Sequence, residues 1–365
     1  MWLMIMLILL GLALLAVYYL MTRFHRFSFV QELAAGHRAL SWLVAFLPLA
    51  LLGLFAAKNV TTLIVVLLHL TAGFLLCGLI ASLTKRLAGV EIPYDIQGAA
   101  AIVLTAVYLS AGWYMAHHVF ETDYRFETGK PLRQDYRIAA LADSHLGVTL
   151  DGEAFAREMR RIQELQPDAV VIVGDFVDDS SKAEDMIAAC KALGELNTAY
   201  GVFYVYGNHD KGYYHNRDFS PAQLRENLEN NGVVILEDES VPLGDSLVLI
   251  GRKDRSDPTR KNMAELAAGL DPDKVSVVLD HQPNDYDAQA AAGVDFVLSG
   301  HTHGGHIFPA GIIGLLMGAN DANYGVERRG NTTFVVTSGI SGWAIPFKTG
   351  AKSEFVIMDI AAPRS

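Results

Sequence analysis

Residues 169–178 read Ala-Val-Val-Ile-Val-Gly-Asp-Phe-Val-Asp, an unbroken apolar run that ends in a glycine and two aspartates. Such a run, without polar alternation, is typical of a strand buried on both faces of a sheet. In open α/β sheets, ligand sites lie beyond the carboxyl ends of the strands. The stretch therefore predicts an α/β domain with a polar site where its strands end.

Four other apolar stretches end in the same way. Strands are predicted at residues 136–142, 202–206, 275–279 and 296–298, and they are followed by Asp143-Ser144-His145, Gly207-Asn208-His209-Asp210, Asp280-His281 and Gly300-His301-Thr302-His303. Five of the seven histidines after residue 120 fall at these strand ends. A random distribution of histidine would not produce this pattern, so we expect the strand ends to form one site.

Helices are predicted between these strands, at residues 155–166, 183–196 and 221–230. Further strands are predicted at residues 247–250, 333–337 and 355–360. Strands that alternate with helices indicate a layered α/β fold. Because the helices become fewer in the second half, the pattern allows either one mixed sheet or two stacked sheets.

The polar groups at the strand ends have the chemistry of metal ligands. A mixed set of Asp, Asn and imidazole suits Mn, Fe or Zn better than Ca or Mg. Seven such groups exceed the needs of one tetrahedral zinc and match a pair of metals that share a carboxylate. In Asp-x-His and His-x-His, both side chains lie on one side of an extended backbone.

The order DxH, GDxxD, GNHD, H and GHxH resembles the calcineurin-like metallophosphoesterase superfamily over nearly all of residues 136–360. The resemblance implies a four-layer (αββα) α/β sandwich that holds two divalent cations, with manganese as the first expectation and iron or zinc as alternatives. It implies that one metal is held by Asp143, His145 and His303, and the other by Asn208, His281 and His301. Asp175 would bridge the two.

The resemblance also implies catalytic roles for two neighbouring residues. His209 would stabilise the transition state or protonate the leaving oxygen, and Asp210 would orient the imidazole of His209. A hydroxide that bridges two metals about 3.5–4 Å apart would attack phosphorus in line.

The first third of the chain has a different composition from the rest. No charged side chain occurs in residues 1–22, 40–57, 59–84 and 96–120, and each segment approaches or exceeds the roughly 20 residues that cross a bilayer. We therefore expect a four-helix transmembrane region at residues 1–120, a linker at 121–135 and the catalytic domain at 136–365. The first segment lacks a basic n-region, which favours a retained anchor over a cleaved signal peptide.

The distribution of charge predicts the orientation and excludes one class of partner. Residues 1–120 carry six Lys and Arg against three Asp and Glu, while the whole chain has a net charge of −11, so the remainder is strongly acidic. An acidic domain does not favour nucleic acid, and we expect none as a partner. The basic loops at residues 23–38 and 85–86 are expected in the cytoplasm. This orientation predicts a multi-pass protein of the inner or cell membrane with a periplasmic or extracytoplasmic catalytic domain.

Weaker signals concern the substrate. The strings GHTHGGH, IFPAGIIGLLMG and TSGISGW resemble the bacterial membrane-anchored branch of the superfamily, which includes hydrolases of lipid-linked nucleotide diphosphates. Substrate contacts are predicted for His215, His306, Arg328 and Arg329. The alternative for His306 is a hydrogen bond within its loop, and the alternative for the two arginines is a solvated position on the surface. The apolar segment 307–318 either packs on its own domain or forms an acyl-chain or membrane-facing lip.

Three hypotheses follow for the function. The first is a membrane-anchored dinuclear-metal phosphoesterase that hydrolyses a phosphodiester, phosphomonoester or pyrophosphate bond of a lipid-linked substrate. The second keeps this chemistry for a soluble nucleotide or phosphate ester, with the spans as an anchor only. The third is a membrane scaffold without catalysis, which predicts no bound transition metal. The sequence does not determine the oligomeric state.

Overall fold

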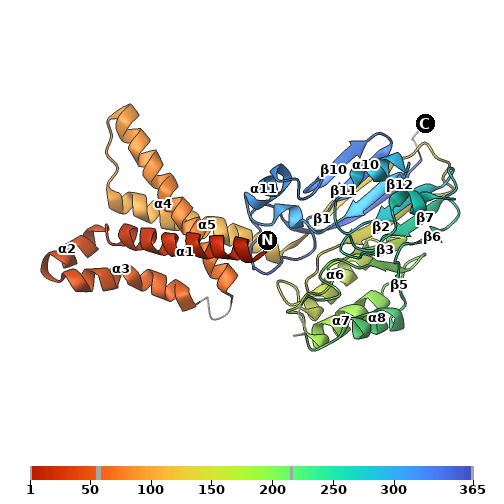
Figure 1. Ribbon diagram of the computed structural model, residues 1–365, viewed down its shortest axis with the longest axis horizontal. Coiled ribbons are helices and arrows are strands. Elements are labelled where there is room, and N and C mark those ends of the chain that lie inside the picture. The colour runs from red at the N-terminus through yellow and green to blue at the C-terminus, as the bar shows by residue number, and fades with distance from the viewer. Residues whose placement is uncertain (1, 55–58, 214–216, 363–365) are drawn as a thin grey trace. The chain divides into compact units, whose positions relative to one another are not determined.

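The computed structural model describes residues 2–54, 59–213 and 217–362, and the chain divides into two compact units, Met1–Gly112 and Trp113–Ser365 (Figure 1). The first unit is helical. The second contains all the strands and the predicted metal ligands. Each unit is considered by itself below.

In its described residues the helical unit contains five helices, the last of which continues into the second unit: α1 (Trp2–Phe24), α2 (Ser28–Gly36), α3 (Arg38–Gly53), α4 (Val60–Ala88) and α5 (Tyr94–His117). Among the described residues, α4 and α5 are long and apolar enough to cross a membrane. Two further apolar helical segments, Leu10–Phe24 within α1 and Arg38–Gly53, are shorter than a span requires. The expected four-helix transmembrane region is thus supported for two helices only. Helix α2 lies in the expected first loop.

The second unit is built on two six-stranded sheets. In the first sheet the order is β1-β12-β2-β3-β4-β5, and its strands are β1 (Val119–Glu127), β2 (Tyr136–Leu141), β3 (Ala169–Val173), β4 (Val202–Val205), β5 (Val233–Ile235) and β12 (Ser353–Ala361). In the second sheet the order is β10-β11-β9-β8-β7-β6, and its strands are β6 (Glu239–Leu243), β7 (Leu247–Gly251), β8 (Val275–Leu279), β9 (Phe296–Ser299), β10 (Gly325–Arg329) and β11 (Thr332–Val336).

Alternate side chains along the strands belong to different apolar layers. On β2, Ala139 and Leu141 pack with side chains of α6 (Gly152–Glu164), α7 (Ala183–Gly194) and α8 (Pro221–Asn230). Ile138 and Ala140 pack against the second sheet, in a layer that includes Leu249 and Val277. The other face of the second sheet packs on α9 (Met263–Ala267) and α10 (Tyr286–Ala291). Helices, two sheets and helices therefore form an α/β sandwich, as expected.

Strand β1 differs from the expected linker. It pairs in parallel with β12 from Val119↔Ser353 to Glu127↔Ala361, so residues 121–127 belong to the sheet and the helix expected to reach residue 120 ends at His117. Only Val119 of this edge strand is fully buried, and its partner lies more than 200 residues away. A half-exposed edge strand carries a weak local apolar signal, so its pairing depends on the tertiary structure.

Most predicted elements lie where the pattern placed them. Strands β3 and β8 and helix α8 have the expected bounds, and the other predicted strands and helices agree within a few residues. Apart from α2 and β1, the unexpected elements are short ones, among them β5, β6, β10, α9, α10 and α11 (Ala310–Leu316). Short elements span too few residues for a periodic signal.

Candidate metal centre

The carboxyl ends of both sheets meet at one place. His301 N–H donates to Oδ1 and Oδ2 of Asp143 at 3.0 Å, which joins the end of β9 to the end of β2. His281 Nδ1, after β8, lies 2.7 Å from the carbonyl oxygen of Val173, at the end of β3. The polar groups after β2, β3, β8 and β9 are thereby brought together across the sandwich.

The first cluster contains Asp143, His145 and His303, all buried, with one candidate ligand atom from each lying within 4.8 Å of the others. His303 Nε2 is 3.2 Å from His145 Nε2. His303 Nδ1 faces the carbonyl oxygen of Ser341 at 3.2 Å, which requires the proton on Nδ1 and leaves a lone pair on Nε2. Two imidazole nitrogens that face each other at this distance are suited to share a cation.

The second cluster contains Asp175, His281 and His301, again within 4.8 Å of one another. Because His281 Nδ1 faces a carbonyl oxygen, its Nε2 is the free ligand atom, and it lies 3.1 Å from Asp175 Oδ2. The same Oδ2 lies 3.6 Å from His145 Nε2 of the first cluster. Asp175 therefore stands between the two clusters, where a shared carboxylate is needed.

Asn208 has the orientation of a ligand. Its Nδ2 donates to the Tyr213 hydroxyl at 2.8 Å, and its Oδ1 is buried with no hydrogen-bond partner among the described residues. A buried amide oxygen without a partner is costly, and a cation would satisfy it. This orphaned atom and the paired imidazole nitrogens show that the donor set fits divalent cations.

The charges of the site also favour a cation. Burial raises the pKa of Asp143 to about 6. Burial also opposes the charged form of Asp175, but the positive charge and hydrogen bond of His281 hold the pKa of that carboxyl below its usual range. Conversely, the pKa of His281 is raised well above its usual value by Asp175, against the effect of burial. A field that stabilises a proton between these two groups also stabilises a metal ion there.

The backbone is strained at these positions. Left-handed φ angles occur at Asp143 (57°), His145 (36°), Asp175 (51°), His301 (69°) and His303 (49°). Residues other than glycine rarely adopt this region, and such strain gathers at functional sites. The turns after three different strands, β2, β3 and β9, therefore direct their side chains inward at an energetic cost.

Comparison with known proteins agrees with this geometry. Residues 136–305 match the family described as calcineurin-like phosphoesterase. An uncharacterized metallophosphoesterase of Aquifex aeolicus is 30% identical over 247 residues, which cover 65% of this chain and 90% of that protein. The chain belongs to the calcineurin-like metallophosphoesterase family.

Two further relatives of this metallophosphoesterase are longer proteins. An uncharacterized metallophosphoesterase of Campylobacter jejuni is 32% identical over 63% of this chain and 60% of that protein. A Bos taurus protein named transmembrane protein with metallophosphoesterase domain is 29% identical over 64% of this chain and 54% of that protein. The chain thus spans less than two thirds of the length of these two relatives.

Asp210 does not orient His209 as expected. Its carboxylate accepts hydrogen bonds from the backbone N–H groups of Asp175, Phe176, Val177 and Gly207 at 2.7–3.1 Å. Both carboxylate oxygens of Asp210 thus accept from backbone N–H groups, and these bonds connect the loop after β3 to the loop after β4. The metallophosphoesterase uses this residue to position Asp175.

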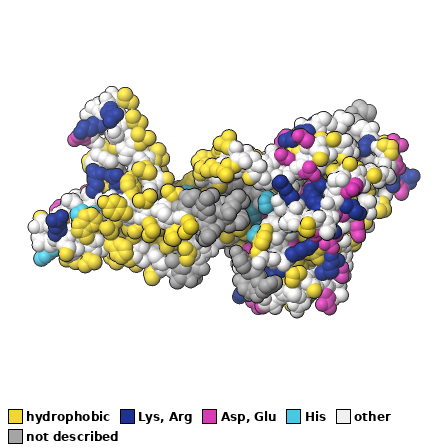
Figure 2. All heavy atoms as spheres, in the orientation of Figure 1, with side chains coloured by type: hydrophobic (Ala, Val, Ile, Leu, Met, Phe, Trp, Pro, Cys, Tyr) yellow, Lys and Arg dark blue, Asp and Glu magenta, His cyan; other side chains and the backbone are white. Residues whose placement is uncertain are grey.

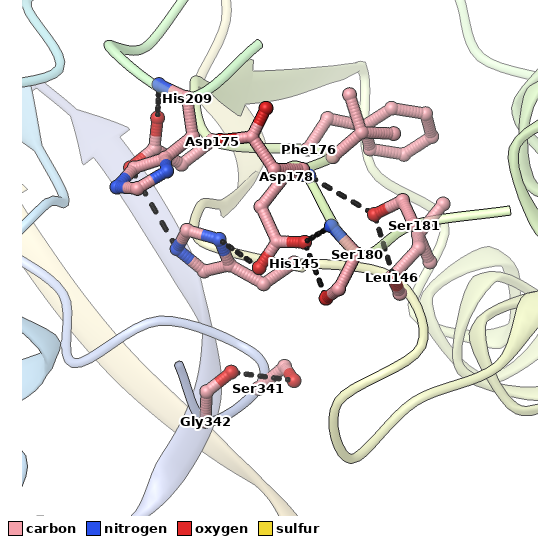
Figure 3. A network of polar contacts seen from close by, with 12 residues as sticks. His145, Leu146, Asp175, Phe176, Asp178, Ser180, Ser181, His209, Ser341 and Gly342 are labelled. Carbon is pink, nitrogen blue, oxygen red and sulfur yellow. Dashed lines mark hydrogen bonds and ion pairs between the residues drawn. The ribbon is translucent and has the colours of Figure 1, made fainter. Parts of the chain in front are cut away.

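His209 lies at the partly exposed edge of the cluster. Its backbone N–H donates to Asp175 Oδ1 at 2.8 Å, as Figure 3 shows. Its ring centroid is 5.1 Å from that of His145, 5.0 Å from Tyr213 and 5.6 Å from Trp343. The imidazole is therefore held next to the metal ligands by the backbone and by two aromatic rings.

Several residues support the ligands from outside the predicted set. Asp178 Oδ2 lies 3.5 Å from His145 Nδ1, and Ser180 donates to the Asp178 carboxylate from both its backbone and its hydroxyl (Figure 3). Tyr213 and Trp343 flank His209. The sequence offered a signal for Asp178, which belongs to GDxxD, but none for the two aromatic residues, whose loops reach the site only in the folded chain.

The four predicted substrate residues have different positions. His306 lies beside the site, with its ring centroid 5.2 Å from that of His303 and its Nε2 buried without a hydrogen-bond partner in the described part of the chain. His215 lies outside the described residues.

Arg328 and Arg329 are not at the site, which corrects that expectation. They pair with Thr333 and Thr332 at the start of β11, whereas the metal ligands follow strand ends. Arg329 instead forms ion pairs with Asp287 and Glu327. The reason is the direction of β10. Because β10 runs antiparallel to β11, its last residues lie beside the start of β11, at the end of the sheet away from the site.

Proposed function

We propose that this chain is a membrane-anchored phosphoesterase that hydrolyses a phosphoric ester with two divalent cations. The observation that carries the proposal is the pair of Asp/His clusters joined by Asp175 at the meeting edge of the two sheets. Membership of the family supports metal-dependent phosphoester hydrolysis.

The proposed ligands divide between the two clusters. Asp143, His145 and His303 would hold one cation, Asn208, His281 and His301 the other, with Asp175 between them. Such cations would supply Lewis acidity that polarises the phosphoryl group and stabilises the charge of an in-line displacement. The mixed oxygen and nitrogen donors favour manganese, with iron or zinc as alternatives.

The chain's own residues complete the chemistry. His209 is proposed to donate a proton to the leaving oxygen, since its ring lies next to the first cluster and is partly exposed. Tyr213 and Trp343 would restrict the ring and the substrate to one orientation. Asp210 would hold Asp175 in place through the backbone.

The experiment is hydrolysis of a generic phosphodiester by the full chain loaded with manganese. Asp143→Asn and His301→Ala are expected to lower turnover by at least about 100-fold, because each removes a ligand that orients a cation. Glu184→Gln, on the exposed face of α7, is the matched control and should retain full activity. Retained activity in both ligand variants would contradict the mechanism, and the absence of bound transition metal would favour a scaffold.

For the substrate of this phosphoesterase, we propose a lipid-linked phosphoester or pyrophosphate. Its support is the presence of two membrane-length helices and relatives named as transmembrane proteins. The alternative is a soluble nucleotide or phosphate ester. Comparing turnover of an ester in lipid vesicles with turnover of a water-soluble ester by the same preparation distinguishes the two.

We also propose that the catalytic unit is extracytoplasmic. Lys85 and Arg86 lie at the end of α4, before the connection to α5, and basic connections stay in the cytoplasm. Residues after α5 would then lie outside. A reporter enzyme that is active only outside the cytoplasm, fused after residue 365, tests this placement, and an inactive but well-expressed fusion would reverse it.

A further inference from the structure

Helix α11 is apolar on every side, and although Gly311 lies against Gly305, its large side chains stay exposed. None of its residues is buried, and the exposed fractions of Leu316 and Met317 are 83% and 78%. Phe308, Ile312 and Ile313 are exposed by about half (56%, 53% and 49%). Figure 2 shows these apolar side chains gathered over α11. Contiguous apolar exposure of this kind marks an interaction surface.

The sequence around α11 offers no charged side chain to a partner. Residues 307–318 contain no charged side chain, and the helix has only seven residues, about 10 Å in length. Such a helix is too short to cross a bilayer but suits the boundary between headgroups and acyl chains. We call residues 308–317 the apolar lip.

The position of the lip within its own unit indicates what binds to it. Phe308 N–H donates to Thr349 Oγ1 at 3.0 Å, which attaches the lip to the segment before β12. Four residues later, Ser353 begins β12, and its hydroxyl donates to the carbonyl oxygen of Ala116 in the last turn of α5 at 3.0 Å. Four residues span at most about 14 Å. The lip is therefore anchored close to the end of α5.

A second connection leads to the same place. Tyr324, after the lip, donates its hydroxyl to Glu354 Oε2 at 2.9 Å, and the same carboxylate oxygen accepts from Thr122 of β1. Strand β1 begins two residues after α5 ends. The chain on both sides of the lip is thus bonded to β12 or to the segment just before it, and β12 pairs with β1, which follows a helix of membrane length.

The end of α5 has the composition of a membrane interface. Trp113 and Tyr114 are about half exposed near its last turn (50% and 49%), and Trp and Tyr concentrate where a span meets the headgroups. An apolar helix attached beside such a point would meet lipid.

We propose that the apolar lip docks into the lipid bilayer surface beside the end of α5 and holds the metal centre against the membrane. The lip begins directly after His303 and His306, so a docked lip places these residues at the bilayer surface. This extends the proposed function from an anchored enzyme to one that works on substrates at the bilayer surface, and its catalytic test rests on that function.

The first test measures lip insertion and does not depend on catalysis. The full chain carries Leu316→Cys in a Cys77→Ala, Cys190→Ala background, a fluorophore on the new thiol, and is reconstituted in phosphatidylcholine–phosphatidylglycerol vesicles with or without spin-labelled lipid. The control is Ile187→Cys on α7, another exposed apolar position (50%). We expect at least twofold quenching at residue 316 and none at 187. Equal emission with and without quencher overturns the proposal, and cross-linking between copies through residue 316 without lipid quenching would assign the lip to a second copy.

The second test measures the effect of docking on turnover. Leu316→Glu with Met317→Glu should lower hydrolysis of a phosphoester with acyl chains in vesicles at least tenfold, and should change turnover of a water-soluble ester less than twofold. Ile187→Glu should affect neither substrate. Unchanged vesicle turnover in the double variant would overturn the link between docking and the site. If the unmodified chain hydrolyses neither substrate, the proposed function fails, while lipid quenching still decides the docking.

Discussion

His209 and Asp210 are neighbours in the chain, but their side chains have different tasks. The carboxylate of Asp210 is fully buried and accepts four backbone N–H bonds, whereas the ring of His209 is partly exposed beside the ligands. Burial, reinforced by the charge of Asp175, raises the pKa of Asp210 to about 6, so the N–H bonds from Gly207 and Val177 are needed to hold the charged form. One residue therefore holds the backbone of two loops, and the ring of the other lies partly exposed beside the candidate ligands.

Two substitutions separate these tasks. Asp210→Asn leaves an amide group facing backbone N–H donors and should lower the free energy of unfolding by about 1–3 kcal/mol, with loss of bound metal. His209→Ala should keep the metal content and lower kcat by about 100- to 10,000-fold. Denaturation curves, elemental analysis and turnover measure the two effects. Loss of metal in His209→Ala, with full metal in Asp210→Asn, would reverse the assignment.

At the scale of elements, the loops after β3 and β4 depend on a close approach at Gly174. Gly174 has φ 79°, and a Cβ there would lie 2.6 Å from both Gly207 N and His281 Nδ1. A side chain at this position would push the two strand ends apart and displace the second cluster. Position 174 therefore requires glycine for two reasons: its φ angle is positive, and the close contact between the two sheets leaves no room for a Cβ atom.

Gly174→Ala should therefore be far more costly than the same change at Gly201. Gly201 also has a positive φ of 97°, but nothing lies within 4 Å of its added Cβ. We expect a loss of about 1–2 kcal/mol for Gly201→Ala and about 2–5 kcal/mol for Gly174→Ala, which adds overpacking. Chemical denaturation measures both, and equal losses would show that the close approach does not matter.

An ion pair joins β12 to β2, and β12 is the strand that pairs with the edge strand β1. Arg137 donates from Nε to Asp359 Oδ1 at 2.8 Å and from Nη2 to Oδ2 at 2.9 Å. The hydrogen bonds from Arg137 lower the pKa of Asp359, against the effect of partial burial. A lowered carboxyl pKa stabilises the fold above the ordinary value near 4, and that stabilisation is lost as the pH falls through the folded-state value.

Asp359→Asn should remove this dependence on pH. Because the arginine is nearly half exposed, the cost at pH 7 is expected to be below about 1 kcal/mol, and it should be smaller at pH 3 than at pH 7. Unfolding midpoints at the two pH values check the sign. A larger cost in acid than at neutral pH would contradict the role of this pair.

At the scale of the whole molecule, metal binding and folding of the catalytic unit should be coupled. The two clusters take ligands from both sheets, so cations that bind only the folded state stabilise the contact between the sheets. At a free metal concentration 100 times the Kd, the gain is about 2.7 kcal/mol.

Chelation should therefore lower both activity and the thermal midpoint of the catalytic unit. Manganese added back should restore both in the unmodified chain and neither in Asp143→Asn. Scanning calorimetry with and without chelator measures the shift. An unchanged midpoint in the unmodified chain would indicate that the clusters hold no cation in solution.

Much of the site could be predicted from sequence because its information is local. Asp143, Asp175, Asn208, His281, His301 and His303 each follow a strand with a strong apolar pattern, and parallel strands bring their ends to one edge. The sandwich and its two sheets follow from the same alternation. The half-exposed strands β1 and β10 lack that pattern.

Tertiary structure decided what depends on direction and distance between distant segments. The antiparallel course of β10 removes Arg328 and Arg329 from the site, and the approach of two loops turns Asp210 toward backbone rather than toward His209. The pairing of β1 with β12 converts an expected linker into sheet and brings the apolar lip to the end of α5. The amino-acid sequence by itself determined which residues are the candidate metal ligands, because strand, turn and candidate ligand are adjacent in the chain. Only the tertiary structure decided which residues position the candidate ligands and which segments lie beside them, because those contacts join segments that can be more than 200 residues apart in the chain.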